Sequence, residues 1–107
     1  MSRAKVLKCP QRSSPFLVDE GEDRFDEYLI ISPEYFICYN INSEDLTPNI
    51  NLTKYGGVLC NIPGDAIICK NNDDGDTINI EENILSKMSD LIKADTEQRK
   101  RFMKRVM

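Results

Sequence analysis

Runs of β-branched and aromatic residues dominate the first half of the chain. Residues 28–31 (YLII) form one continuous run, and residues 35–41 (YFICYNI) form the longest. The residues between them, Ser32, Pro33 and Glu34, supply a turn, because proline presets φ for the first corner. The pattern predicts a β-hairpin with at least one fully buried strand.

Shorter runs predict further strands. Residues 4–9 are apolar enough for a short edge strand, or for an arm that orders on a partner, and residues 15–18 read as another strand. Residues 58–62 and 66–70 flank Pro-Gly-Asp, which predicts a second hairpin.

The polar stretches between these runs predict turns and loops. Residues 42–54 read as a loop with one helical turn at 43–46, which Ser43 could cap. Residues 71–76 predict a third turn before residues 77–80, which alternate between polar and apolar.

The hydrophobic period changes after residue 80. Five apolar residues recur at the spacing of one helix face: Ile84, Leu85, Met88, Leu91 and Ile92. Residues 95–98 (DTEQ) then look like an N-cap with a capping glutamine, and the stripe resumes beyond them. The pattern predicts either one long helix with a weak middle or two helices that meet near residues 94–95.

These elements predict an α+β fold, a small and mostly antiparallel sheet or partial barrel of about five to six strands packed by a C-terminal helix. The expected organisation is a basic arm or edge strand at 1–14, a core domain at 15–94 and a basic amphipathic helix at 95–107. The expected core consists of Leu29, Ile31, Phe36, Cys38, Val58, Cys60, Ile67, Cys69, Ile78, Ile80, Leu85, Met88 and Ile92.

Composition limits the class of protein. A chain of 107 residues, 40% hydrophobic and 30% charged, is typical of one globular domain. It holds no apolar run of the roughly 18 residues that a membrane helix needs, so we expect no membrane partner. No secretory signal is recognisable, and we therefore expect an intracellular protein of the cytoplasm or nucleus.

The four cysteines do not suggest a metal site. They stand far apart, at positions 9, 38, 60 and 69, and the chain has no histidine to complete a zinc site. Three of them lie inside β runs and read as small buried hydrophobic residues, whereas Cys9, before Pro10, is the expected exposed thiol. We predict no metal and no cofactor.

Residue patterns typical of a catalytic site are equally sparse. Without histidine, neither a Ser–His nor a Cys–His arrangement can form. Residues 71–76 (NNDDGD) resemble a calcium loop, but the first ligand would be Lys70 and a strand precedes it, so a hairpin turn is favoured. The remaining carboxylate clusters lie in polar loops, and we expect a protein that is not an enzyme.

Charge is the most informative property. The net charge of −4 conceals two basic ends: residues 1–12 carry four bases and no acid, and residues 91–107 carry six bases against two acids. Near the C-terminus the bases coincide with an apolar stripe: Arg99, Arg101, Phe102, Met103, Lys104, Arg105 and Val106.

Four interpretations of this basic segment compete. The bases can complement a helix dipole at a solvated surface, dock a helix into a partner's groove, contact nucleic acid, or lie on a membrane surface, the weakest of the four.

The leading hypothesis is a non-enzymatic protein-interaction module, a subunit or adaptor of a larger heteromeric assembly. It would dock through the basic amphipathic helix at 95–107. The alternative is a nucleic-acid-associated protein that contacts phosphates through both basic ends. The N-terminal contacts would then come from Arg3, Lys5, Lys8 and Arg12. The sequence leaves the partner's identity and the oligomeric state open.

Overall fold

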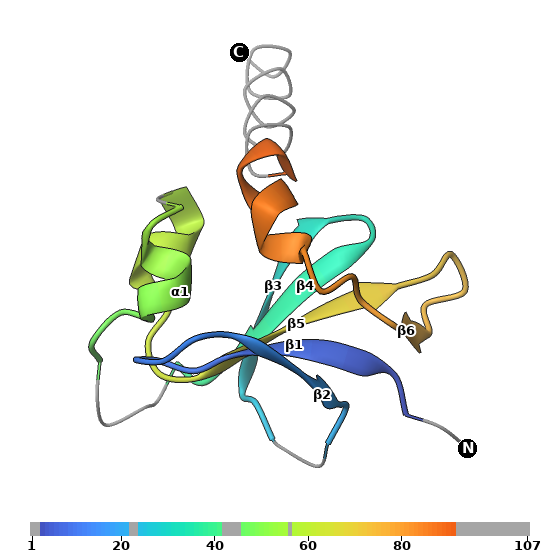
Figure 1. Cartoon of the computed structure of the whole chain (residues 1–107), viewed down its shortest axis with the longest axis horizontal. Helices are drawn as coiled ribbons and strands as arrows, with labels where there is room; N and C mark the ends of the chain where they lie inside the picture. Colours follow the sequence, from blue (N-terminus) through green and yellow to red (C-terminus); the bar gives the residue numbers. More distant parts are fainter. Residues whose placement is uncertain (1–2, 22–23, 42–45, 56, 92–107) are drawn as a thin grey trace.

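The computed structural model describes residues 3–21, 24–41, 46–55 and 57–91 of the chain. They form an α+β domain built on an antiparallel sheet of six strands that does not close into a barrel (Figure 1). The strands follow the order β2-β1-β5-β4-β3, and β6 pairs with β5 off this path. In chain order the elements are β1 (Lys5–Cys9), β2 (Phe16–Asp19), β3 (Glu27–Ser32), β4 (Tyr35–Tyr39), α1 (Ile50–Thr53), the 3-10 helix η1 (Gly57–Asn61), β5 (Ala66–Asn71) and β6 (Thr77–Ile78).

The central hairpin confirms the strongest sequence pattern. Strands β3 and β4 pair antiparallel across the predicted turn, with Leu29 opposite Ile37 and Ile30 opposite Phe36. The register shifts between Ile30 and Ser32, next to the turn. The predicted strand at 15–18 is also confirmed as β2. The turn predicted at residues 71–76 lies between β5 and β6 and occupies residues 72–76, because Asn71 is the last residue of β5.

Strand β1 differs from the edge strand that the sequence suggested. It lies between β2 and β5 and pairs with both: Leu7 stands opposite Leu17 on one side and Ile68 on the other. An interior position fits its burial, since Val6, Leu7 and Cys9 are all buried. The first strand is therefore an integral part of the sheet.

The predicted second hairpin is wrong. Residues 57–61 form the 3-10 helix η1, and β5 pairs instead with β1 and β4, its neighbours on either side. Leu59 and Ile62, three residues apart, are both buried, which matches the period of a 3-10 helix. A short apolar run does not by itself distinguish a strand from a helical turn.

A helical turn occurs later than the sequence pattern suggested. Residues 42–45, which include the expected cap Ser43, lie outside the described residues. The observed turn is α1, whose N-cap is Asn49: its side-chain oxygen accepts a hydrogen bond of 2.9 Å from the backbone N–H of Asn51. The cap satisfies one of the N–H groups that a helix start leaves without a partner.

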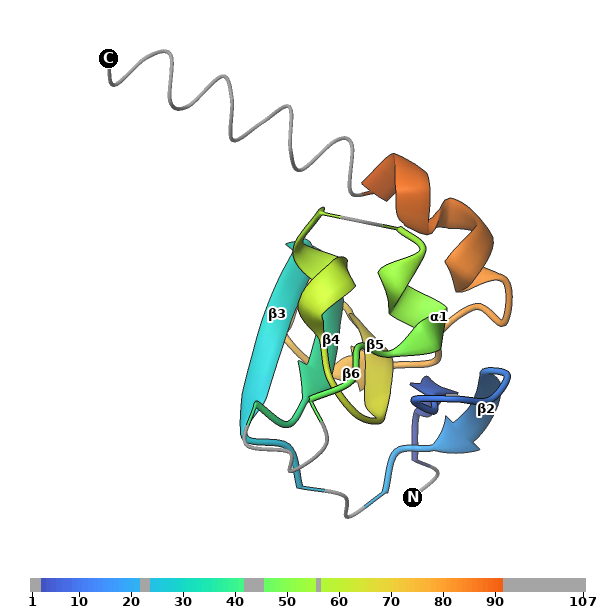
Figure 2. The same ribbon diagram turned by 90° about the vertical axis from the view of Figure 1, so that its left-hand side faces the viewer.

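The sheet has two faces because side chains alternate along each strand. One row of residues in register, one from each of the five strands, forms the helix-covered face: Leu17, Leu7, Ile68, Ile37 and Leu29. Figures 1 and 2 show α1, η1 and the helical residues 84–91 on the same side of the sheet. The buried cluster joins this face to Leu52, Leu59, Ile84 and Met88.

The expected core was partly wrong, because in two strands the residues that face the core are shifted by one position from those expected. The structure confirms Ile31, Cys69, Ile80 and Met88 as buried. In β4, however, Tyr35 and Ile37 point to the core where Phe36 and Cys38 were expected; in β5 Ala66 and Ile68 do so, and Ile67 is half-buried. When every position of a run is apolar, the sequence does not show which alternate residues face the core. A shift of one residue exchanges the buried and the exposed set.

The other expected core residues do not reach full burial. Those that the structure describes are half-buried: Leu29, Cys60, Ile78 and Leu85. The side chains of Val58 and Ile92 lie outside the described part.

Polar contacts attach the start of the last helix to the sheet. The hydroxyl of Tyr35 donates to both carboxylate oxygens of Glu81 at 2.9 Å, and Lys70 Nζ lies 2.6 Å from Glu81 Oε1. Further along, the hydroxyl of Tyr55 donates to the backbone carbonyl of Leu85 at 2.8 Å. These bonds fix the helical residues 84–91 over the sheet, where their side chains Ile84 and Met88 are buried in the core.

Candidate functional site

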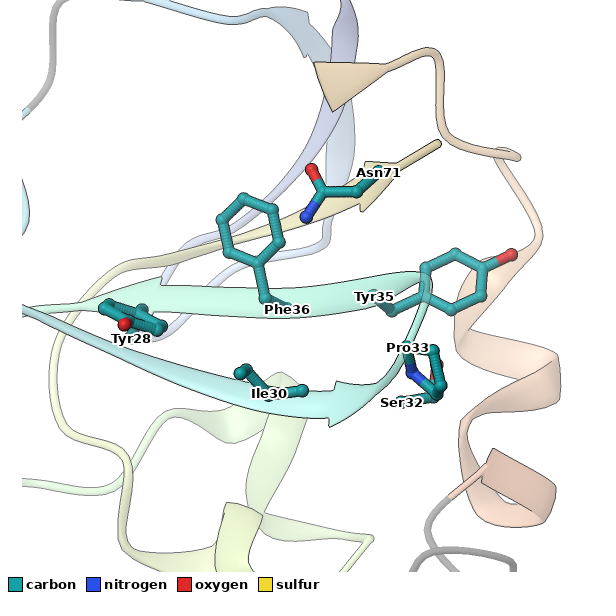
Figure 3. Close-up of a pocket in the computed structure, with 7 residues that line it drawn as sticks. All are labelled: Tyr28, Ile30, Ser32, Pro33, Tyr35, Phe36 and Asn71. Atoms are coloured by element: carbon teal, nitrogen blue, oxygen red, sulfur yellow. The ribbon is translucent and has the colours of Figure 1, made fainter. Parts of the chain in front are cut away.

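A shallow groove of about 270 Å³ lies at the strand β3 edge of the sheet (Figure 3). Strand β3 and its turn, strand β4 and strand β5 contribute the lining residues Tyr28, Ile30, Ser32, Pro33, Tyr35, Phe36 and Asn71. Tyr28, Ile30 and Phe36 belong to the face opposite the helices, here called the outer face. They alternate along their strands with the residues that face the core, and Ile30 stands opposite Phe36 in the register. The ring of Tyr35 points away toward the helical residues and Glu81.

The groove exposes large apolar side chains. Tyr28 is 65% exposed and Ile30 is 59% exposed, while Phe36 is half-buried between them and the neighbouring strand. Scattered exposed apolar residues are ordinary, but here they adjoin one another and Pro33 at one edge of the sheet. The groove is therefore an apolar patch, which is the feature that marks interaction surfaces.

Acidic residues lie close in sequence to the residues that line this patch. Residues 26–36 and 71–77, which together contain every lining residue, hold six acids and no base. Within the described part of the chain, no ion pair engages the carboxylates of Glu34, Asp73, Asp74 or Asp76. The two sequence segments that form the groove are therefore acidic, without a compensating base.

Hydrogen bonds order the two turns that carry four of these acidic residues. The backbone N–H of Asn71 donates to the carbonyl of Glu34 at 2.7 Å, which joins the turn after β3 to the end of β5. The side-chain oxygen of Asn72 accepts from the N–H groups of Asp74 and Asp76, and Gly75 has the positive φ of 85° that the turn needs.

The cysteines are placed differently from one of the sequence expectations. Cys9, expected to be exposed, is completely buried at the end of β1, and burial raises the pKa of its thiol to about 12. Cys38 and Cys69 lie next to each other on the outer face. Their mutual hydrogen bond lowers the pKa of Cys38, and the same bond, followed by burial, raises that of Cys69.

Among the described residues, no three cysteine, aspartate or glutamate side chains come together as a metal site. Nor does any helix in this part of the chain combine the length and apolar character needed to cross a membrane.

The Glu81 carboxylate is the most perturbed acid that the structure describes. Burial alone would raise its pKa, but hydrogen bonds from Lys70, its own backbone and Tyr35 outweigh burial and lower the pKa to about 2. Burial, followed by the hydrogen bond and the charge of Glu81, raises the pKa of Tyr35. The hydrogen bond to Glu81 raises the pKa of Lys70. This cluster connects the helix to the sheet on the face away from the groove.

The residues predicted from the basic C-terminal pattern lie outside the described part of the chain: Arg99, Arg101, Phe102, Met103, Lys104, Arg105 and Val106. The structure describes all four basic residues predicted at the other end. Arg3 donates to the carbonyl of Glu20, and Lys5 pairs with Asp19 at 2.5 Å.

The N-terminal bases do not share one surface. Lys5 and Lys8 stand three positions apart in β1 and therefore occupy opposite faces of the sheet. Arg12 follows the strand in an exposed loop. The structure thus distributes these charges over two faces and a loop.

Sequence reasoning missed the groove, although a signal for it is present. A strand with one solvated face normally alternates polar and apolar residues, whereas residues 28–31 are apolar throughout. The unbroken run suggested a strand buried on both faces. Because β3 is the edge strand, half of that run is exposed instead.

Comparison of this chain with protein-family models, with curated proteins and with solved structures found no match.

Proposed function

We propose that this protein is a non-enzymatic protein-interaction module that binds apolar side chains of a basic partner segment in the groove at β3 and β4. The observation that carries the proposal is the exposure of Tyr28 and Ile30 beside Phe36, in segments of the chain that are rich in carboxylates. Aromatic anchors with a charged rim are the usual composition of an interaction hot spot.

The dimensions of the groove favour a protein partner over a small molecule. Ligand pockets generally enclose about 300–1,000 Å³ and bury most of their ligand. This groove is smaller, at about 270 Å³, and lies open along a sheet edge, so it suits one or two anchoring side chains of a larger partner. A role as subunit or adaptor of a larger assembly follows from such a surface.

The basic C-terminal segment supplies a second docking element in this proposal. On a helix, Phe102, Met103 and Val106 share one face, and five bases between residues 99 and 105 provide steering charge. An acidic groove and a basic amphipathic segment in one chain allow it to connect two partners.

The test is a peptide selected from a random library against the immobilised full-length chain, with its Kd measured in solution. Ile30→Lys places a charge in the groove, and we expect it to weaken binding at least about tenfold, as loss of a hot-spot contact does. Ile50→Lys is the matched control, because Ile50 is the same residue type, is equally exposed at 59% and lies on α1, away from the groove. Selected peptides that bind the Ile30→Lys variant as tightly as the wild type would contradict the proposal.

Nucleic-acid association is the second candidate function, and the observation that favours it is the surplus of bases at both ends of the chain. Contact with phosphates would give binding that weakens steeply as salt rises. A fluorescence titration with nonspecific DNA or RNA at a low salt concentration of about 50 mM decides it. Absence of binding there would eliminate this alternative.

A further inference from the structure

We infer that the groove of one molecule receives the basic C-terminal segment, residues 99–107, of a second copy, so that copies associate head to tail. The inference rests on the proposed function, because it names the occupant of the same groove. Three properties of this chain support it: its charge, the apolar content of the segment and the groove, and the position of the groove and the last helix on opposite faces of the sheet.

Charge complementarity is the first argument. Residues 99–107 contain five bases and no acid, and the two segments that build the groove contain six acids and no base. Glu34 stands between the lining residues Pro33 and Tyr35, and the aspartates of the β5–β6 turn follow the lining residue Asn71. Lys70, the nearest base in sequence, is paired with Glu81. Opposite potentials of this kind accelerate encounter and fix the orientation of docking.

Apolar content is the second argument. The segment carries Phe102, Met103 and Val106, spaced so that they share one face of a helix. The groove offers Tyr28, Ile30 and Phe36, which accept an aromatic ring by stacking and a methionine through sulfur–aromatic contact. The volume of about 270 Å³ is of the order of two such side chains rather than of a folded domain.

The faces of the sheet provide the third argument. The helical residues 84–91, from which the chain continues toward the segment, pack on the helix-covered face through Ile84 and Met88. The groove opens on the outer face, on the opposite side of the sheet. To fill its own groove the chain would have to cross the edge of the sheet, whereas a second copy approaches the outer face directly.

Such a contact joins two different surfaces and leaves a groove and a segment free at the two ends of every dimer. Heterologous contacts of this type build rings or open chains of molecules. The inference therefore predicts self-association that increases with protein concentration. It should weaken between about 0.1 M and about 1 M salt, where the Debye length falls from about 10 Å to about 3 Å.

The decisive experiment combines two damaged full-length variants. Ile30→Lys removes the groove and Phe102→Asp removes the apolar anchor of the segment. Each variant alone should remain monomeric in sedimentation velocity, and an equimolar mixture should form a one-to-one dimer and no larger species. In such a mixture a single intact groove faces a single intact segment. The Ile50→Lys control should associate as the wild type does, and circular dichroism verifies that each variant is folded.

Several results would overturn the inference. A wild-type chain that stays monomeric at all concentrations excludes association between copies. A mixture that stays monomeric although the wild type associates indicates a symmetric contact instead. The segment could instead fill the groove of its own molecule. In that case a labelled peptide of residues 95–107 would bind the Phe102→Asp variant more tightly than the wild type, and copies would not associate. If a library peptide still depends on Ile30 in any of these cases, the proposed function stands and only the occupant is wrong.

Discussion

Two buried asparagines decide the local structure between β1 and the helical layer. Asn49 is fully buried, and its amide group donates to the carbonyls of Cys9 at 2.8 Å and Gly64 at 2.7 Å while its oxygen caps α1. The amide of Asn51 donates to the carbonyls of Pro10 and Ser13. These side chains replace the backbone partners that loop carbonyls lack in the interior. Their engagement also leaves the Asn-Leu-Thr sequence at residues 51–53 without an accessible amide for glycosylation.

Asn49→Ala should destabilise the protein by about 2–4 kcal/mol, because it leaves two carbonyls without a donor and removes the cap of α1. Urea denaturation followed by circular dichroism measures the change. Asn61→Ala, at an exposed asparagine, is the matched control and should shift stability by no more than about 0.5 kcal/mol. Equal effects of the two substitutions would contradict the structural role of Asn49.

Acid stability should depend on Glu81. Its pKa is lowered to about 2 in the folded protein, from an ordinary value of 4.5, so the unfolded chain binds the proton more readily. The stability that Glu81 contributes is present above pH 4.5 and is lost as the pH falls from there toward 2. Glu81→Gln should flatten this part of the profile and cost about 1 kcal/mol near neutral pH, a modest value because the side chain is 30% exposed.

The pH dependence is measured as the denaturation midpoint between pH 2 and pH 7. Glu82→Gln, at the exposed neighbouring position, serves as the control and should retain the wild-type profile. An unchanged acid slope in the Glu81→Gln variant would show that the contacts with Lys70 and Tyr35 do not persist in solution. Folding also raises the pKa values of Lys70 and Tyr35. The stability of the protein should therefore also fall at alkaline pH, as these two groups lose their protons.

At the scale of elements, the central hairpin shows how a strand at the sheet edge comes to expose apolar side chains. Every residue of the 28–31 run is compatible with burial. Within the described residues, however, β3 pairs with a single strand and the helical segments pack on one face of the sheet. Alternate residues of the run consequently remain exposed. A strand of the same composition in the interior of a two-sided core would have no such surface.

The hairpin therefore contains a matched pair of isoleucines with opposite roles. Ile37→Ala should cost about 3–4 kcal/mol, because Ile37 is fully buried among the helices, and Ile30→Ala no more than about 1 kcal/mol, because Ile30 is mostly exposed. Chemical denaturation of both variants provides the comparison. A larger cost at Ile30 than at Ile37 would mean that the faces of β4 and β3 are assigned the wrong way round.

At the scale of the whole molecule, charge and hydrophobicity separate into complementary regions. Residues 13–90 are strongly acidic and both ends are basic, so a chain with a net charge of only −4 carries strong local fields. Part of the acidic excess falls in the two segments that form the apolar groove on the outer face. This arrangement is the basis of the proposed head-to-tail association, whose salt dependence belongs to the molecule as a whole.

The sequence by itself determined the α+β class, the β3–β4 hairpin, the turn at 71–76 and the helix stripe that begins at Ile84, because each depends on local turn chemistry or on a hydrophobic period. The tertiary structure decided which face of each strand is buried, placed β1 inside the sheet and converted residues 57–61 into a 3-10 helix. Continuous apolar runs and short segments carry no period that distinguishes these outcomes. The groove likewise required the fold, since it joins residues from β3, β4 and β5 that only the order of the strands brings together.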